Sequence, residues 1–217
     1  MTAAAVSQPV FTEPQPVAAP APLFACALPG ETSRLVVSFS GVGKHSYERP
    51  AFEFTGTASA KGQNHALFIG DEDRTWMTAP GLAANIVTLI EDYVKAHSIT
   101  EIVTLGNSMG GFMALRIADL TRVDTVIAFA PQFSVDTNIM PEETRWALYL
   151  DKITDWPIRD VGTLSVSNTQ YFVFHGDDVV EAQHWLRFPQ GDNIHHFIVA
   201  GESHGVAGLL RNHSALG

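Results

Sequence analysis

One serine stands among three glycines in the segment Leu105-Gly-Asn-Ser-Met-Gly-Gly-Phe112. The apolar run 102–105 ends just before Ser108, and a helical pattern of apolar residues begins just after it. The chain must therefore turn from strand to helix within about three residues, which glycines allow. A serine in such a turn would project its hydroxyl above the edge of the sheet, beside the first amides of a helix. The same residues also fit a plain serine cap at a glycine-rich helix start.

Short apolar runs recur along the chain and predict β-strands that are buried on both faces. These runs are 35–39, 66–69, 102–105, 125–129, 171–174 and 196–199. Apolar residues at helical spacing predict crossover helices over 80–97 and 112–118, and shorter helices over 181–186 and 206–211. The alternation predicts an α/β fold, with a mostly parallel sheet flanked by helices in a three-layer sandwich. Ligands of such sheets bind beyond the carboxyl ends of the strands.

The N-terminal part of the chain has a different composition. Residues 1–30 are rich in alanine and proline, which disfavour both helix and central strand. We expect this segment to be an arm or tail, in which 10–12 or 23–28 could form an edge strand. Residues 31–217 are predicted to form a single domain.

The connection after the run 125–129 is longer than a simple link between two elements. It predicts a lid-like insertion at about 132–168, with a helix from Pro141 to Leu150. Trp146, Tyr149 and Trp156 lie in this insertion and would favour an apolar or sugar-bearing substrate, or simply pack within the fold.

The Gly106-x-Ser108-x-Gly110 pattern between a strand and a helix resembles the α/β-hydrolase superfamily, in which it forms the nucleophile elbow. The resemblance extends in element order from about Leu35 to Leu210 and implies the α/β-hydrolase fold, with the N-terminal hairpin either missing or supplied by the arm. Phe-Ser-Gly near the start and Ala-Phe-Ala-Pro-Gln at 128–132 are similar to a group of small bacterial hydrolase-like proteins. Some proteins of that group accompany surface-polysaccharide machinery.

The resemblance implies a base located in a loop after the last strand. A serine needs such a base because its hydroxyl attacks poorly at neutral pH, and an imidazole titrates in the required range. His204 lies in Gly201-Glu-Ser-His-Gly-Val206, directly after the run 196–199. His204 is therefore the implied base, with His196 and His213 as alternatives.

The resemblance also implies a carboxylate after the preceding strand, where the chain reads His175-Gly-Asp-Asp-Val-Val-Glu181. Superfamily members often show His-Gly-x-x-Asp here, whereas these aspartates come one and two positions earlier. Asp178 is nearest to the usual spacing and is the expected acid, Asp177 is the second choice, and Glu181 is expected to begin a helix. Either aspartate could instead cap that helix. The acid would orient the imidazole and stabilise its charged form.

Attack on an acyl carbon places negative charge on the carbonyl oxygen, which two backbone N–H groups would bind. The resemblance implies Met109, next to the nucleophile, as one donor. The second would be Val42 in Ser-Gly-Val-Gly, the loop after the run 35–39. A flexible turn explains these glycines equally well.

Composition narrows the classes of ligand and partner. The formal net charge of −10 disfavours nucleic acid and anionic membrane surfaces. The N-terminus has no basic region of a secretory signal, so we expect a cytoplasmic protein. The single cysteine, Cys26, closes no intramolecular disulfide, and no metal-binding motif is present in the sequence.

Taken together, these residues predict a serine hydrolase that cleaves a small carboxylic ester or thioester and requires no cofactor. Ser108 would attack, His204 would move the proton and Asp178 would orient His204. An acyltransferase with the same triad, or a non-catalytic member that binds a ligand or partner on this scaffold, remains the alternative.

Overall fold

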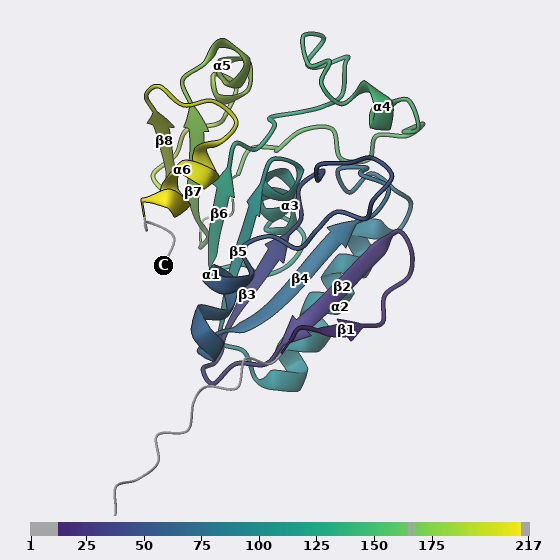
Figure 1. Ribbon diagram of the computed structural model, residues 1–217, viewed down its shortest axis with the longest axis vertical. Helices are drawn as coiled ribbons and strands as arrows, with labels where there is room; N and C mark the ends of the chain where they lie inside the picture. The colour runs from purple at the N-terminus through teal and green to yellow at the C-terminus, as the bar shows by residue number, and fades with distance from the viewer. Residues whose placement is uncertain (1–12, 165, 167, 214–217) are drawn as a thin grey trace, which may run out of the picture.

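The computed structural model describes residues 13–164, 166 and 168–213. Its centre is one eight-stranded sheet in the order β1-β2-β4-β3-β5-β6-β7-β8 (Figure 1). The strands are β1 Gln15–Val17, β2 Leu23–Leu28, β3 Arg34–Phe39, β4 His65–Asp71, β5 Glu101–Asn107, β6 Thr125–Phe129, β7 Gln170–Gly176 and β8 Ile194–Val199. Strands β3 to β8 are parallel, whereas β2 pairs antiparallel with β4. The predicted α/β fold with a mostly parallel sheet is confirmed.

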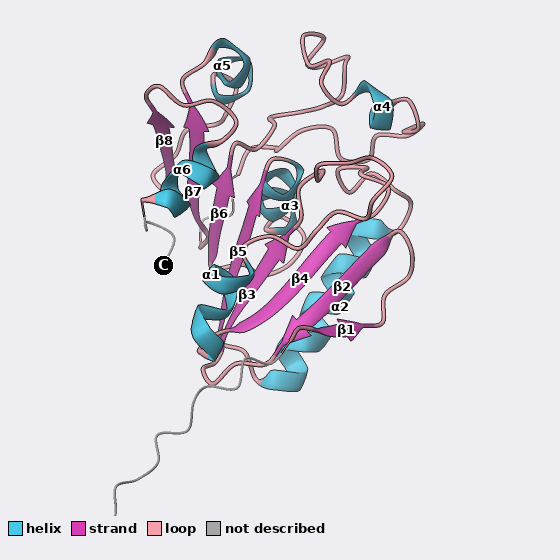
Figure 2. Cartoon of the chain, viewed as in Figure 1, coloured by secondary structure: helices cyan, strands magenta, loops and turns pink. Residues whose placement is uncertain are grey.

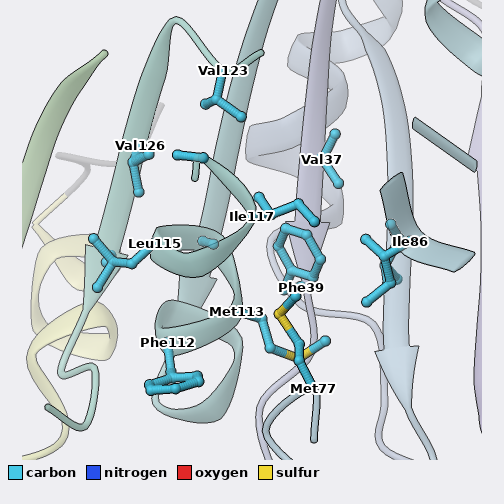
Figure 3. Packing of buried hydrophobic residues seen from close by; sticks show 14 of the residues in the cluster. Val37, Phe39, Met77, Ile86, Phe112, Met113, Leu115, Ile117, Val123 and Val126 are labelled. Carbon is cyan, nitrogen blue, oxygen red and sulfur yellow. The ribbon is translucent and has the colours of Figure 1, made fainter. Parts of the chain in front are cut away.

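Helices cover both faces of the sheet. They are α1 Thr55–Ser59, α2 Leu82–His97, α3 Met109–Ile117, α4 Ala147–Leu150, α5 Val179–Trp185 and α6 Val206–Asn212, with a short 3₁₀ helix over Ala60–Gly62. Side chains of α2 and α3 pack on one face, where Figure 3 shows Phe39 of β3 close to Met113 and Met77. Residues of α1 and α6 pack with Phe68 and Phe129 on the other face.

The carboxyl ends of the parallel strands lie together at one end of the sheet, and the predicted lid-like segment lies beyond this end (Figure 2). The central strands are almost wholly buried, as shown by β4, in which every residue from His65 to Asp71 is buried. This two-sided burial explains the continuous apolar runs in the sequence, because both faces of each strand contact a helical layer.

The candidate strand 23–28 is present as β2, although β1 and not β2 is the strand at the edge of the sheet. Strands β1 and β2 lie within the predicted 1–30 arm and form an antiparallel hairpin at one end of the sheet. The prolines of this region lie at an edge, where a missing N–H is tolerated. Residues 10–12, the other candidate edge strand, lie outside the described residues.

The predicted helix from Pro141 to Leu150 is also shorter than expected, because only α4 is helical. The Glu143 side chain accepts a hydrogen bond from the backbone N–H of Arg145, and this local bond competes with a helical turn. In the described part of the chain, the structure contains no helix long and apolar enough to cross a membrane.

Candidate active site

Ser108 occupies a sharp turn between β5 and α3. Its backbone has φ 58° and ψ −123°, a region that side-chain-bearing residues rarely adopt and that is often found at functional sites. The turn depends on its glycines: a Cβ on Gly106 would lie 2.2 Å from the carbonyl carbon of Gly110, and one on Gly110 would lie 2.2 Å from the Phe39 oxygen. The predicted strand–turn–helix geometry around Ser108 is therefore present.

His204 lies against the serine. Its Nε2 atom is 2.9 Å from Ser108 Oγ, although 96 residues separate the two in sequence. The loop between β8 and α6 carries His204 and passes close to the end of β7, where a Cβ on Gly176 would lie 2.3 Å from the Glu202 oxygen. The other two candidate histidines lie elsewhere, because His196 contacts His175 and His213 contacts the carbonyl of Leu209.

The carboxylate that contacts His204 belongs to Glu181 of α5. The imidazole Nδ1 is 2.9 Å from Glu181 Oε1, and only 1% of the Glu181 side chain is exposed. Burial raises the pKa of Glu181, but the hydrogen bond and charge of His204, together with the charge of Arg145, outweigh this effect and lower the pKa. Glu181 is thus held as a carboxylate beside the imidazole.

The expected acid, Asp178, has a different place. Its carboxylate caps α5 by accepting hydrogen bonds from the backbone N–H groups of Val180 and Glu181. Asp177 accepts from the backbone N–H of Gly201 at 2.9 Å and so anchors the loop that carries His204. Because the aspartates come early in this turn, they serve as helix cap and loop anchor. The structure therefore corrects the expected placement: Glu181, in the first turn of α5, faces the histidine.

Arg145 of the lid-like segment contacts the same Glu181 oxygen as His204. Its guanidinium lies 3.2 Å from Glu181 Oε1 and also contacts Glu143. His184 accepts a hydrogen bond from the backbone N–H of Phe133 at Nδ1, so its proton is on Nε2 and is donated to Glu143 at 2.8 Å. Burial raises the pKa of Glu143, but the hydrogen bonds from His184 and Arg145 outweigh burial and lower the pKa to about 2.

Gln132 is a site residue that the sequence did not reveal. Its side-chain Nε2 donates to Ser108 Oγ at 3.0 Å, and its Oε1 accepts from Trp76 Nε1 at 3.1 Å. An indole N–H can only donate, so the Gln132 oxygen must face Trp76 and its amide hydrogens must face the serine. Ser108 Oγ therefore accepts from Gln132 and donates its own proton to His204. His204 in turn donates from Nδ1 to Glu181.

Comparison with solved structures finds similar folds at low sequence identity. A capsule O-acetyltransferase of Neisseria meningitidis serogroup A superposes with a TM-score of 0.62 at 14% identity, covering 89% of this chain and 90% of that one. An α/β serine hydrolase homologue from Coxiella burnetii gives 0.60 at 13% identity, covering 97% and 98% of the chains. An α/β serine hydrolase without lid from Xanthomonas campestris gives 0.56 at 16% identity, covering 97% and 94%. The protein has the α/β-hydrolase fold. No protein-family model and no curated protein matches the chain.

In this α/β-hydrolase fold, the two expected oxyanion donors lie on neighbouring elements. Met109 begins α3, where a backbone N–H has no partner within the helix. Val42 belongs to the loop after β3, whose Gly41 lies so close to β5 that a Cβ would be 3.2 Å from the Asn107 oxygen. The Val42 carbonyl accepts from Arg74 Nε at 2.8 Å, which fixes this loop.

Glu53 is a second carboxyl group beside the same loop. It accepts a hydrogen bond from the backbone N–H of Gly41 and lies within the electrostatic reach of His204. Burial raises the pKa of Glu53 to about 7, although the Gly41 hydrogen bond and the His204 charge both act in the opposite direction. Glu53 is thus a carboxyl group that titrates near neutral pH next to the expected oxyanion loop.

A cavity of about 550 Å³ adjoins the site on the face of the sheet covered by α1 and α6. It is lined by residues 52–57, by Asn107 next to the serine, and by Ala207, Gly208 and Arg211 of α6. Asn107 directly precedes Ser108, and Ala207 comes three residues after His204, so the cavity lies near this pair without being lined by either side chain. Among the described residues, no group of three or more His, Cys, Asp or Glu side chains is placed to hold a metal ion.

The backbone of Gly110 lies so close to Gly106 that adding one methyl group at Gly106 should strongly lower the stability of the protein. Gly106→Ala would force its Cβ against the backbone of Gly110, so we expect the free energy of unfolding to fall by about 1–3 kcal/mol or more. Gly56→Ala in α1 is the matched control because a Cβ there meets nothing within 4 Å. It should leave stability unchanged or raise it by up to about 1 kcal/mol. Equal stability of the two variants in urea unfolding would contradict the close-packed elbow.

The raised pKa of Glu53 predicts that the contribution of this residue to stability depends on pH. The unfolded chain releases this proton near pH 4.5, whereas the folded protein keeps it until about pH 7. Glu53 therefore stabilises the folded state less as pH rises through this window. We expect Glu53→Gln to gain about 1–3 kcal/mol relative to wild type between pH 4.5 and pH 8, measured by urea unfolding. Glu142→Gln, at an exposed position, is the control, and a pH-independent difference for Glu53→Gln would contradict the assignment.

Proposed function

We propose that the protein is a serine hydrolase that cleaves a carboxylic ester or thioester through an acyl-enzyme on Ser108. The observation that carries this proposal is the directed series of hydrogen bonds from Ser108 through His204 to Glu181, at distances of 2.9 and 2.9 Å. Each member has the chemistry its position requires: a nucleophile on a strained turn, an imidazole base and a buried carboxylate.

The first half-reaction would transfer the acyl group to the serine. His204 Nε2 takes the hydroxyl proton as Oγ forms a bond to the acyl carbon, and the carbonyl π electrons move onto its oxygen. When the carbonyl re-forms, the bond to the leaving oxygen or sulfur breaks. His204 then returns the proton to that leaving group. The second half-reaction repeats these steps with water as the nucleophile and releases the free acid.

Glu181 would act on the imidazole without taking its proton. It fixes the tautomer with a proton on Nδ1 and stabilises the imidazolium formed during attack. Arg145 positions Glu181 by an ion pair. Gln132 occupies one lone pair of Ser108 Oγ, so the hydroxyl proton is directed at His204.

The backbone N–H groups of Met109 and Val42 are the donors we propose for the developing oxyanion. Met109 stands at the N-terminus of α3, where unpaired N–H groups and the helix dipole favour negative charge. The neutral form of Glu53 is compatible with charge developing near the loop 40–42, whereas its ionised form would repel that charge.

Acyl transfer to an alcohol is the second candidate, and the 550 Å³ cavity favours it. The leaving group departs next to the proton on His204, and the acceptor in the second half-reaction arrives at the same place. This cavity is lined by polar groups such as Thr55 of α1 and Arg211 of α6, and it could hold an acceptor larger than water. A protein of similar fold is named as a capsule O-acetyltransferase, which is consistent with acyl transfer on this fold.

The nucleophile assignment predicts covalent labelling. A fluorophosphonate probe should label the wild-type protein, and Ser108→Ala should abolish labelling because it removes the hydroxyl that contacts His204. His204→Ala should slow labelling by about a hundredfold or more. Labelling that is absent from wild type, or that survives Ser108→Ala, would favour a non-catalytic binding protein. Adding alcohols to a p-nitrophenyl ester assay and identifying the products separates transfer from hydrolysis.

The acid assignment predicts opposite results for two isosteric substitutions in one turn. Glu181→Gln removes the charge beside His204 and should lower kcat/KM for p-nitrophenyl acetate by about 10²–10⁴-fold. Asp178→Asn retains a good helix cap and should leave kcat/KM within about threefold of wild type. The reverse ranking would show that Asp178 serves the imidazole in solution.

A further inference from the structure

Two tryptophans close one side of the site around Ser108. Trp76 is fully buried and is linked to Ser108 Oγ by a single intervening side chain, that of Gln132. The ring centroids of Trp76 and Trp146 are 5.9 Å apart, and those of Trp146 and His204 are 6.2 Å apart. Aromatic rings at such separations are in contact. The three rings therefore form a continuous surface beside the nucleophile, without room for a hydrocarbon chain between neighbouring rings.

Neither tryptophan is free to move aside. Trp76 is part of the main hydrophobic core. Trp146 follows Arg145, whose guanidinium lies 5.6 Å from the Trp146 ring and is paired with Glu143 and Glu181. Both of these carboxylates are 1% exposed, so displacing the segment around Trp146 would break buried ion pairs.

The geometry of attack directs the acyl substituent toward this aromatic surface. The carbonyl oxygen faces the N-terminus of α3 and the loop after β3, and the leaving group faces His204 and the cavity beside α6. In the sheet, β5 lies between β3 and β6. Besides His204, the side chain bonded to Ser108 Oγ is that of Gln132 after β6, which holds Trp76 of the loop after β4, and Trp146 packs on Trp76. We therefore place the acyl substituent against these side chains.

We infer that Ser108 accepts only a short acyl group, of acetyl or propionyl size, and that Trp146 limits its length. This inference rests on the proposed acyl-enzyme chemistry and adds the substrate class. Gln132 supplies a polar floor to the acyl position, and the Trp76 and Trp146 rings supply its wall. A longer chain would meet the faces or edges of these rings within a few carbon atoms of the carbonyl.

Packing, and not a hydrogen bond of its indole nitrogen, places the Trp146 ring. This Nε1 atom is buried and has no hydrogen-bond partner among the described residues. A buried N–H without an acceptor costs free energy, so the contacts of this ring with Trp76 and His204 must outweigh that cost.

The test is a series of p-nitrophenyl esters with acetyl, butyryl and octanoyl groups, used with wild type and two tryptophan variants. For wild type we expect kcat/KM to fall by about tenfold or more from acetate to butyrate, and further to octanoate. Trp146→Ala should raise the octanoate-to-acetate ratio of kcat/KM by about tenfold or more. Trp146→Phe, which keeps a smaller ring in place, should shift the ratio in the same direction by less.

Trp156→Ala is the matched control, because Trp156 lies in the same segment and is also partly buried. It should leave the chain-length ratio unchanged even if it lowers overall activity. Efficient turnover of octanoate by wild type, or an unchanged ratio in both Trp146 variants, would overturn the inference. Either outcome would leave the proposed function intact as long as the fluorophosphonate probe labels the wild-type protein. Absence of both labelling and ester turnover would overturn the two together.

Discussion

The site depends on a negative charge buried at Glu181, which is stable only when it is paired. Its partners come from separate parts of the chain: His204 from the loop after β8, and Arg145 from the segment beyond β6. Removing one partner of a buried pair leaves an uncompensated charge, at a typical cost of about 3–5 kcal/mol. The same interaction that orients the imidazole therefore also fastens the C-terminal loop and the lid-like segment to α5.

Close packing of the backbone fixes the turn that carries Ser108. Neighbouring strands and α3 approach the elbow so closely that Gly106 and Gly110 have no space for a Cβ. This packing holds Ser108 at a strained backbone angle, with its hydroxyl directed between Gln132 and His204. If Ser108 is the proposed nucleophile, this positioning by packing means that little rearrangement would precede attack.

The strands and the nucleophile turn were predictable because they depend on local signals. Continuous apolar runs marked the buried strands, and the glycines around Ser108 marked the tight turn. His204 was identified from its place after the last strand, and the structure puts it next to the serine. In the N-terminal hairpin, the strand 23–28 was a candidate from the sequence, whereas β1 was not recognised, since edge strands tolerate prolines and lack a strong pattern.

The remaining site residues depend on three-dimensional contacts that no local pattern encodes. Asp178 and Glu181 are both acidic residues near one helix start, and only the direction of the helix decides which carboxylate faces His204. Gln132 ends the quoted Ala-Phe-Ala-Pro-Gln segment and Arg145 lies in the predicted helix over 141–150, but neither pattern indicates what the side chain contacts. Their roles follow from hydrogen bonds to residues 24 and 36 positions away. Helix α4 is shorter than predicted for a similar reason. The Glu143 side chain accepts hydrogen bonds from the Arg145 backbone and from His184, and these contacts replace a helical turn before α4.

The proton between His204 and Glu181 can be observed directly. An imidazole N–H that donates to a buried carboxylate gives a strongly downfield proton resonance in NMR spectra, which selective ¹⁵N-histidine labelling assigns to Nδ1. We predict such a resonance in wild type and in Asp178→Asn, and its loss or marked upfield shift in Glu181→Gln. A resonance that survives Glu181→Gln but disappears in Asp178→Asn would contradict the account, as would its absence from wild type.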